Sequence, residues 1–341
     1  MLLSRRQSAL LLTQLLIMKD IDGFQPLTEH MGASAPVSPV AKPQTSFRRA
    51  LGLEEVSGTS FPPCPAVIGH RGALYAELEN TIPAFLQCAT WGCAGVELDV
   101  FTLTDGSVIV FHGAGTDEDP GYCTDYCIGK DGVNILDMTY EETQKLRFNP
   151  NFAEFPCASD KISTARIPLL SEVLEALRGT GLEVKIELKG PNTVAPVLKV
   201  VESLGMTGQC SYSSFDHSKL KELRKLRPDY SAYRTGALFN TPVPDDYLQR
   251  AKDCGATEIH LRYDTCTVDR VQASRKAGFR TMAWLRGPQG MASDSQDVFE
   301  DMGNEDESCY RALWETGVDQ ICCNRPDFAL QLCNVKENLT P

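Results

Sequence analysis

The chain has 341 residues, of which 42% are hydrophobic and 8% aromatic, enough for a core and too many for a disordered protein. Its net charge of −12 argues against nucleic acid as a partner, because phosphate backbones are bound by basic surfaces. A small phosphate-bearing substrate remains compatible with this charge, since a local cation reverses the field within a cleft.

The N-terminal region differs in composition from the rest of the chain. Residues 1–18 combine Arg5 and Arg6 with an apolar stretch that is too short for a membrane span. They resemble either the core of a signal peptide or an amphipathic helix. Residues 31–47 are rich in Ala, Ser and Pro, as linkers are. We therefore expect a poorly ordered, targeting-like segment over 1–64 and one folded domain over 65–335.

The 13 cysteines lack the regular spacing of a disulfide scaffold, and no CxxC pair is present. We expect buried thiols with one or two bridges rather than a cysteine metal site. The cysteine content and the apolar N-terminus favour a secretory or organellar location over the cytoplasm.

From residue 65 onward, short apolar strands alternate with helical segments. Apolar strands between helices indicate a parallel sheet buried on both faces. The helical segments 80–92, 169–179, 267–278 and 309–317 end in glycine, which best tolerates the left-handed geometry of a helix C-cap. The predicted strands are 66–70, 94–100, 107–112, 182–188, 210–215, 236–240, 258–263, 280–285 and 319–324.

This alternation over ~270 residues fits an α/β fold of the TIM type, a (β/α)8 barrel whose usual size is about 250 residues. A doubly wound sheet is the competing architecture, but no glycine-rich phosphate loop follows the first strand. The predicted strands are one too many for the barrel, and we expect 258–263 to be the extra one.

The connection after the second predicted strand is unusual. Thr104-Asp105-Gly106 forms a hairpin-type turn that leaves no room for a helix before 107–112, so one crossover helix is expected to be missing. Residues 113–160 then form a long insertion after the third strand, rich in Gly, Cys and Asp. Long insertions of this kind often cover a functional site.

Charged residues lie near the carboxyl ends of four early strands, the ends that meet at one mouth of a barrel. Glu97 and Asp99 alternate along one strand, as do Glu187 and Lys189 along another, so each pair shares one side of its strand. The full set is His70, Arg71, Glu97, Asp99, His112, Glu187 and Lys189.

Each of these residues alone has an ordinary explanation, such as a structural histidine or a local ion pair. Together they indicate a site, because charged residues are seldom buried in strands unless they are paired or bind metal. Three carboxylates without neighbouring His or Cys ligands suit a hard cation, Mg²⁺ or Ca²⁺. Two histidines suit a general acid and a general base, and Arg71 and Lys189 suit an anionic substrate. The combination indicates phosphodiester cleavage.

The motifs around these residues resemble those of the glycerophosphodiester phosphodiesterase family. Weaker similarity extends through 169–177, 213–215, 278–284 and 317–327, so the resemblance covers roughly 65–335. The strongest motifs are HRG at 70–72, ENT at 79–81, VELDV at 96–100, VIVFH at 108–112 and KIELKG at 185–190.

The resemblance implies a TIM-type barrel of PI-phospholipase-C-like architecture with one divalent cation, Mg²⁺ or Ca²⁺. It also implies hydrolysis of small glycerophosphodiesters to glycerol 3-phosphate and an alcohol. Two alternatives stay open: lysophospholipase D-like cleavage of lipid phosphodiesters at a membrane surface, and a non-catalytic barrel that binds phosphodiesters.

The resemblance also implies a function for each motif residue. Glu79 would orient the site or the substrate hydroxyls, although it could instead cap the following helix. Trp284 would form a wall beside the glycerol or alcohol, although it could simply pack in the barrel. The resemblance implies His70 and His112 as the acid–base pair and Glu97, Asp99 and Glu187 as the metal ligands. It implies Arg71 and Lys189 as the cations that bind phosphate, and Glu79 and Trp284 as further substrate contacts.

Three stretches depart from the family pattern. From the second histidine the sequence is HGAGTDEDPGYC, where the family has an acidic residue and an LDRTT-like stretch. Later in the chain, WLRG stands in place of a WTVN-like motif and CNRP in place of a TDRP-like motif. The implied ligands and histidines are intact, so these departures bear on the preference for the alcohol group rather than on activity.

Overall fold

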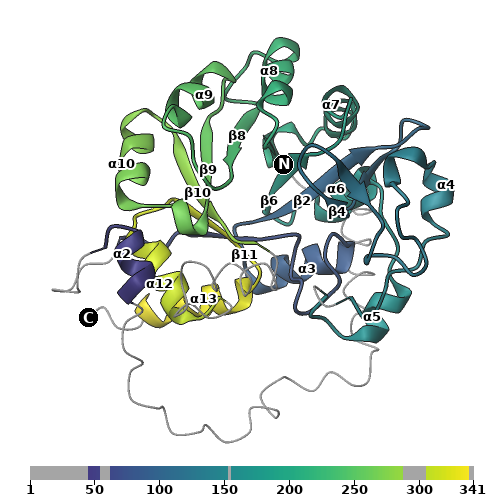
Figure 1. Cartoon of the computed structure of the whole chain (residues 1–341), viewed down its shortest axis with the longest axis horizontal. Helices are drawn as coiled ribbons and strands as arrows, with labels where there is room; N and C mark the ends of the chain where they lie inside the picture. Colours follow the sequence, from purple (N-terminus) through teal and green to yellow (C-terminus); the bar gives the residue numbers. More distant parts are fainter. Residues whose placement is uncertain (1–44, 54–61, 153–154, 287–304, 338–341) are drawn as a thin grey trace, which may run out of the picture. The chain divides into compact units, whose positions relative to one another are not determined.

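The computed structural model describes residues 45–53, 62–152, 155–286 and 305–337, which belong to one compact unit spanning 44–341. Neighbouring strands pair around a full circle, because β1 contacts both β2 and β11, and the expected TIM-type barrel is confirmed (Figure 1). Its parallel strands are β1 (Ala66–Gly69), β2 (Gly95–Thr102), β6 (Glu183–Leu188), β7 (Cys210–Ser214), β8 (Arg234–Phe239), β9 (Glu258–Arg262), β10 (Arg280–Trp284) and β11 (Gln320–Cys323).

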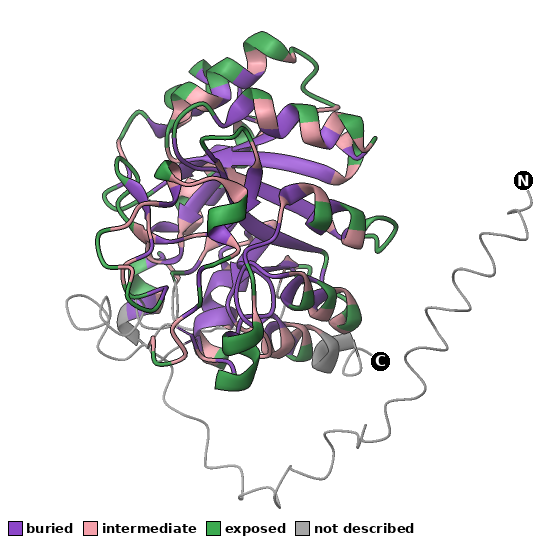
Figure 2. Cartoon of the chain, turned by 90° about the vertical axis from the view of Figure 1, so that its right-hand side faces the viewer, coloured by how far each residue is buried: buried purple, intermediate pink, exposed green. Residues whose placement is uncertain are grey.

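Helices cover the outside of the barrel, and Figure 2 shows buried strands at its centre with exposed helix faces around them. In α6, for example, Leu170, Val173, Leu174 and Leu177 recur at helical spacing and are all buried. The helices are α2 (Thr45–Ala50), α3 (Ile82–Trp91), α4 (Tyr140–Thr143), α5 (Ser159–Thr164), α6 (Leu170–Leu177), α7 (Val194–Ser203), α8 (His217–Leu226), α9 (Tyr247–Asp253), α10 (Val268–Lys276), α12 (Glu307–Glu315) and α13 (Pro326–Glu337).

Of the nine predicted strands, the third in the chain is the one that does not belong to the parallel barrel. Our expectation that 258–263 is the extra strand is therefore wrong. The segment forms β9, which pairs in parallel with both β8 and β10. The extra strand is β3 (Val108–Val110), which runs antiparallel to β2 and pairs Val110 with Val100. Consequently no crossover helix is missing, because α6 lies on the connection from β2 to β6.

The insertion after β3 folds around an aromatic cluster of its own. It contains β4 (Ala114–Gly115), β5 (Pro120–Tyr122) and the 3-10 turn η2 (Ile135–Asp137), followed by α4 and α5. Tyr126 packs against Phe111, Phe152 and Phe155, with ring centroids 4.8 to 5.5 Å apart. This cluster fixes the insertion beside the end of the barrel that carries the site.

Part of the predicted N-terminal segment packs against the barrel domain. Phe47 and Leu51 are fully buried, and Arg48 forms an ion pair with Glu315 of α12 at 2.6 Å. Residues 45–53 therefore belong with the folded domain and not with a poorly ordered segment. Of the predicted 1–64 segment, residues 1–44 and 54–61 lie outside the described residues, and with them the apolar stretch at 1–18. Of the helices that the structure describes, none combines the length and apolarity that crossing a membrane requires.

The cysteines agree with the expectation of buried thiols and a bridge. Cys64, just before β1, forms a disulfide with Cys333 of α13 across a sequence separation of 269 residues. The other cysteines are free and buried.

The amino end of the barrel interior is closed by a buried polar network. Glu258, the first residue of β9, accepts from Lys185 of β6 and from Gln320 of β11, each at 3.0 Å. Neither β6 nor β11 is a neighbour of β9, so these contacts cross the barrel interior. His260 also lies 3.0 Å from Glu258, and the charge of Lys185 helps to hold the pKa of Glu258 well below its usual range against the effect of burial.

Removing Glu258 should destabilise the protein strongly, because it leaves Lys185 buried with Glu183 alone. We expect the Glu258→Ala variant to lose about 3–5 kcal/mol of unfolding free energy in urea denaturation. A matched control is Glu141→Ala, which removes an exposed ion pair with Lys145 and should change the stability little. Equal stability of the two variants would contradict the stabilising role of the network.

Candidate active site

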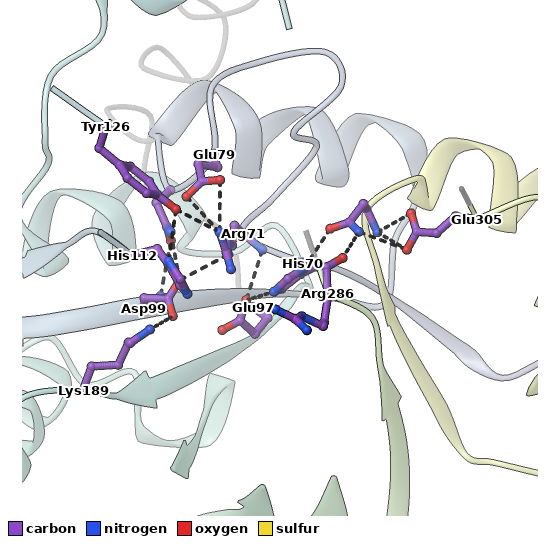
Figure 3. A network of polar contacts seen from close by, with 12 residues as sticks. His70, Arg71, Glu79, Glu97, Asp99, His112, Tyr126, Lys189, Arg286 and Glu305 are labelled. Carbon is purple, nitrogen blue, oxygen red and sulfur yellow. Dashed lines mark hydrogen bonds and ion pairs between the residues drawn. The ribbon is translucent and has the colours of Figure 1, made fainter. Parts of the chain in front are cut away.

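A cavity of about 790 Å³ opens at the carboxyl ends of the barrel strands. It is lined by His70, Arg71, Glu97, Asp99, His112, Glu187, Lys189 and Trp284 among others, so all but one of the predicted site residues face one space. The exception, Glu79, lies behind Arg71 (Figure 3).

The HRG segment forms a tight turn directly after β1. Gly72 has a φ of 91°, and a Cβ at this position would approach Ala84 of α3 to 2.8 Å. Only glycine therefore allows the turn to lie against the helix. Arg71 also has a positive φ of 54°, and its carbonyl accepts from the backbone N–H of Asn80 at 2.9 Å. A left-handed arginine is a strained conformation that the surrounding contacts must maintain.

Three carboxylates meet across two neighbouring strands. Asp99 of β2 is in register with Glu187 of β6, and Glu97 lies two residues before Asp99 on the same side. One oxygen from each of the three carboxylates lies within 4.8 Å of the others. Burial, together with repulsion from Asp99, raises the pKa of Glu97 well above its usual value. Burial likewise raises the pKa of Glu187 to about 7, although Lys189 opposes this.

Asp99 is the carboxylate that the surrounding side chains hold most firmly. Its Oδ atoms lie 3.7 Å from Arg71 Nε and 3.6 Å from Lys189 Nζ. Asn80 donates to its Oδ2 at 2.9 Å and accepts from its backbone N–H at 3.2 Å. Burial alone would raise the pKa of Asp99, but His112 and the charge of Lys189 hold it below its usual range.

The two histidines reach the cavity in different ways. His70 follows β1, and its Nδ1 lies 2.8 Å from Oδ1 of Asn324 while its Nε2 lies 4.0 Å from Glu97. His112 does not follow a barrel strand as predicted: β3 runs back antiparallel to β2 and returns His112 to the level of Asp99.

Burial disfavours the charged form of both imidazoles. Burial and the charge of Arg71 lower the pKa of His70 to about 3 and place that of His112 well below its usual value. Nδ1 of His112 donates to the carbonyl of Gly113 at 2.7 Å, so Nε2 is the nitrogen left to exchange protons.

The contacts of Glu79 and Trp284 bear on the alternatives given above for each residue. Glu79 accepts from Arg71 at 3.2 Å through both carboxylate oxygens, whereas the N-cap of α3 is Thr81. Glu79 thus contacts the guanidinium group of Arg71. Trp284 lines the cavity at the end of β10, donates to the carbonyl of Phe239 at 3.3 Å and meets Phe215 edge to face.

Residues 70–328 match the profile of the glycerophosphoryl diester phosphodiesterase family. The chain belongs to this family. A glycerophosphodiester phosphodiesterase from Caldanaerobacter subterraneus subsp. tengcongensis is 27% identical over 271 residues, which cover 78% of this chain and 96% of the relative. A lysophospholipase D from Mus musculus is 29% identical over 195 residues, 53% of this chain and 59% of the relative.

A solved structure of an Oleispira antarctica phosphodiesterase in complex with the product sn-glycerol-3-phosphate shares the fold. Its TM-score is 0.62 at 20% identity, and the match covers 80% of this chain and 97% of that one. The family and fold that the sequence predicted are therefore confirmed, and the chain is a phosphodiesterase.

Three side chains of the phosphodiesterase contact the predicted residues but were not predicted themselves. Asn80 braces Asp99, Tyr126 lies 3.1 Å from His112 Nδ1, and Asn324 contacts His70. Asn324 follows β11 at the same end of the barrel, so the strand-end rule could have found it. Tyr126 comes from the insertion, where no periodic pattern indicates which side chain turns toward the site.

The carboxylates of the phosphodiesterase fit a divalent cation. Glu97, Asp99 and Glu187 supply only oxygen ligands, which Mg²⁺ and Ca²⁺ prefer. The raised pKa values of Glu97 and Glu187 show that burial and mutual repulsion disfavour three negative charges without a counter-ion. A cation held by these three residues would relieve that repulsion.

Divalent cations should stabilise the phosphodiesterase more at about pH 8 than at about pH 5.5, because binding needs ionised carboxylates. Without a cation, folded Glu187 binds its proton more tightly than the unfolded chain does, where its pKa is 4.5. This preference stabilises the fold below pH 4.5, and the contribution is lost as the pH rises through about 7. Melting temperatures with Mg²⁺, with Ca²⁺ and with EDTA measure both effects.

The Glu187→Gln variant is the control for this experiment and should lose most of the difference between the two pH values. An equal rise in melting temperature at both pH values would show that the cation binds elsewhere.

Proposed function

We propose that the protein hydrolyses glycerophosphodiesters to glycerol 3-phosphate and an alcohol, with a divalent cation held by Glu97, Asp99 and Glu187. The observation that carries this proposal is the meeting of three carboxylates with two histidines in one cavity of a family member. The Oleispira antarctica structure, with sn-glycerol-3-phosphate as product, supports the glycerol phosphate half of the substrate.

Arg71 and Lys189 would bind the phosphodiester oxygens. Both line the cavity, and each lies within 4 Å of a carboxylate oxygen of Asp99. Glu79 holds the guanidinium of Arg71 from behind, so that its remaining N–H groups can face the substrate. A bound cation would add Lewis-acid stabilisation of charge on the phosphoryl oxygens.

The neutral histidines would move the protons of the reaction. One imidazole accepts the proton of the attacking oxygen through Nε2, and the resulting imidazolium is stabilised by the nearby carboxylates. The other imidazole, once protonated in the substrate complex, delivers a proton to the oxygen of the leaving alcohol. Attack by water and attack by a glycerol hydroxyl through a cyclic phosphate both use this pair.

A second candidate is lysophospholipase D-like cleavage of a lipid phosphodiester. The mouse relative and three aromatic residues in the cavity lining favour it, since Phe152, Phe215 and Trp284 would pack against an apolar substrate. The two candidates share the same phosphate site and differ in what the wall contacts.

The decisive assay is release of glycerol 3-phosphate from glycerophosphocholine with Mg²⁺, with Ca²⁺ and with EDTA. Turnover that EDTA abolishes supports the proposal. Cleavage of lysophosphatidylcholine to lysophosphatidic acid, without activity on glycerophosphocholine, would replace it by the second candidate. No activity on either substrate with any divalent ion would leave a barrel that only binds phosphodiesters.

The functions of His112 and Glu97 should separate in two variants. His112→Ala should lose at least about 10³-fold in kcat through loss of a proton-transfer group, while metal affinity stays near that of the native protein. Glu97→Ala should bind the cation more weakly in calorimetric titration and regain part of its activity at high metal concentration. Equal loss of metal affinity in both variants would mean that His112 acts in cation binding.

We also propose that the chain matures in an oxidising secretory or organellar compartment. The Cys64–Cys333 disulfide supports this, because such bridges persist where the glutathione pool does not reduce them. Thiol labelling of protein isolated from its native cell should leave this one pair unmodified, and complete labelling of all cysteines would contradict the proposal.

A further inference from the structure

Behind His70, two buried side chains outside the predicted site form a continuous hydrogen-bonded line (Figure 3). Oδ1 of Asn324, the residue after β11, lies 2.8 Å from Nδ1 of His70. The amide of Asn324 in turn donates from Nδ2 to Oε1 of Glu305 at 3.1 Å. Exposed fractions of 1% for Asn324 and 5% for Glu305 place this line away from solvent.

The surroundings of Asn324 determine which end of its amide faces the histidine. Two acceptors, Glu305 Oε1 and the carbonyl of Arg286, lie at the Nδ2 end. The NH₂ group must point to these acceptors, so the amide oxygen faces His70. An oxygen can only accept, and Nδ1 of His70 must therefore carry the proton. The unprotonated Nε2 then lies on the cavity side, near Glu97.

Glu305 is held in place for this contact by more than one bond. Both of its carboxylate oxygens accept from the backbone N–H of Asn324 at 3.1 Å, in addition to the contact with the side chain. Its φ of 50° lies in the left-handed region, which glutamate adopts at a cost. Burial raises its pKa to about 8, so a neutral carboxyl is compatible with the site near pH 7.

We propose that Asn324 and Glu305 are positioning residues that fix His70 as its Nδ1–H tautomer and direct Nε2 at the reacting phosphodiester. The kinetic part of this inference rests on the proposed function, in which His70 transfers a proton. The structural part does not, because the tautomer of His70 can be observed without substrate. A purely structural alternative is that the two residues only join β11 to the start of α12.

The test compares Asn324→Leu, Glu305→Ala and Glu305→Gln with the native protein. Leucine has nearly the shape of asparagine but no acceptor for His70. The kcat of Asn324→Leu on glycerophosphocholine should fall about 10- to 100-fold with KM nearly unchanged, by analogy with loss of the hydrogen-bond partner of a metal-ligating histidine. The kcat of Glu305→Ala should fall about tenfold. Glu305→Gln keeps an acceptor oxygen, and its kcat should stay within about threefold of the native value.

The matched control is Glu307→Gln, two residues further along. Glu307 pairs with Arg311 at 2.6 Å on the surface of α12, away from His70, and this variant should keep native kinetics. Melting temperatures of all variants show whether a loss of activity reflects unfolding.

Nitrogen-15 NMR of the imidazole rings reads the tautomer directly. Native protein should show His70 protonated at Nδ1, and Asn324→Leu should lose that preference. If Asn324→Leu does not fold, the native tautomer and the difference between the two Glu305 variants still decide.

A native His70 protonated at Nε2 would overturn the proposal, as would equal losses in Glu305→Ala and Glu305→Gln that follow their melting temperatures. If no glycerophosphodiester is hydrolysed at all, the proposed function fails while the tautomer measurement still confirms or rejects the positioning.

Discussion

The structure depends on three carboxylates, two buried and one partly buried, whose oxygens lie within 4.8 Å of one another. Glu97, Asp99 and Glu187 cannot all be ionised in an apolar barrel unless positive charge compensates them, because desolvation and repulsion act in the same direction. Arg71 and Lys189 supply part of this charge through their contacts with the two carboxylate oxygens of Asp99. The remaining deficit is what suits the cluster to the cation that we propose it holds.

The neighbouring structure serves to hold these charges in place. The left-handed Arg71 and the glycine after it bring a guanidinium close to β2, and Asn80 fixes the orientation of Asp99. At the opposite end of the barrel, the buried charges compensate one another. There Glu258 and Lys185 pair with each other across the interior, so no ligand is needed and the charges contribute to stability instead.

Much of this arrangement could be predicted from the sequence, because parallel strands deliver their carboxyl ends to one place. That rule was enough to bring Glu97, Asp99 and Glu187 together with His70 and Lys189. It failed for β3, since an apolar run of six residues reads the same whether it joins the barrel or folds back on its neighbour. The count of nine predicted strands, one more than a barrel has, led us to discount β9, which carries Glu258 and His260 for the interior network. Tyr126 and Glu305 could not be predicted, because loop residues reach the site through tertiary packing that leaves no period in the sequence.

The most direct test of this account is anomalous diffraction from crystals of the protein soaked in Mn²⁺, which stands in for Mg²⁺ and can be located by its signal. The account predicts one strong peak within about 2.5 Å of a carboxylate oxygen from each of Glu97, Asp99 and Glu187. A peak at another position, or none in the cavity at saturating Mn²⁺, would contradict it.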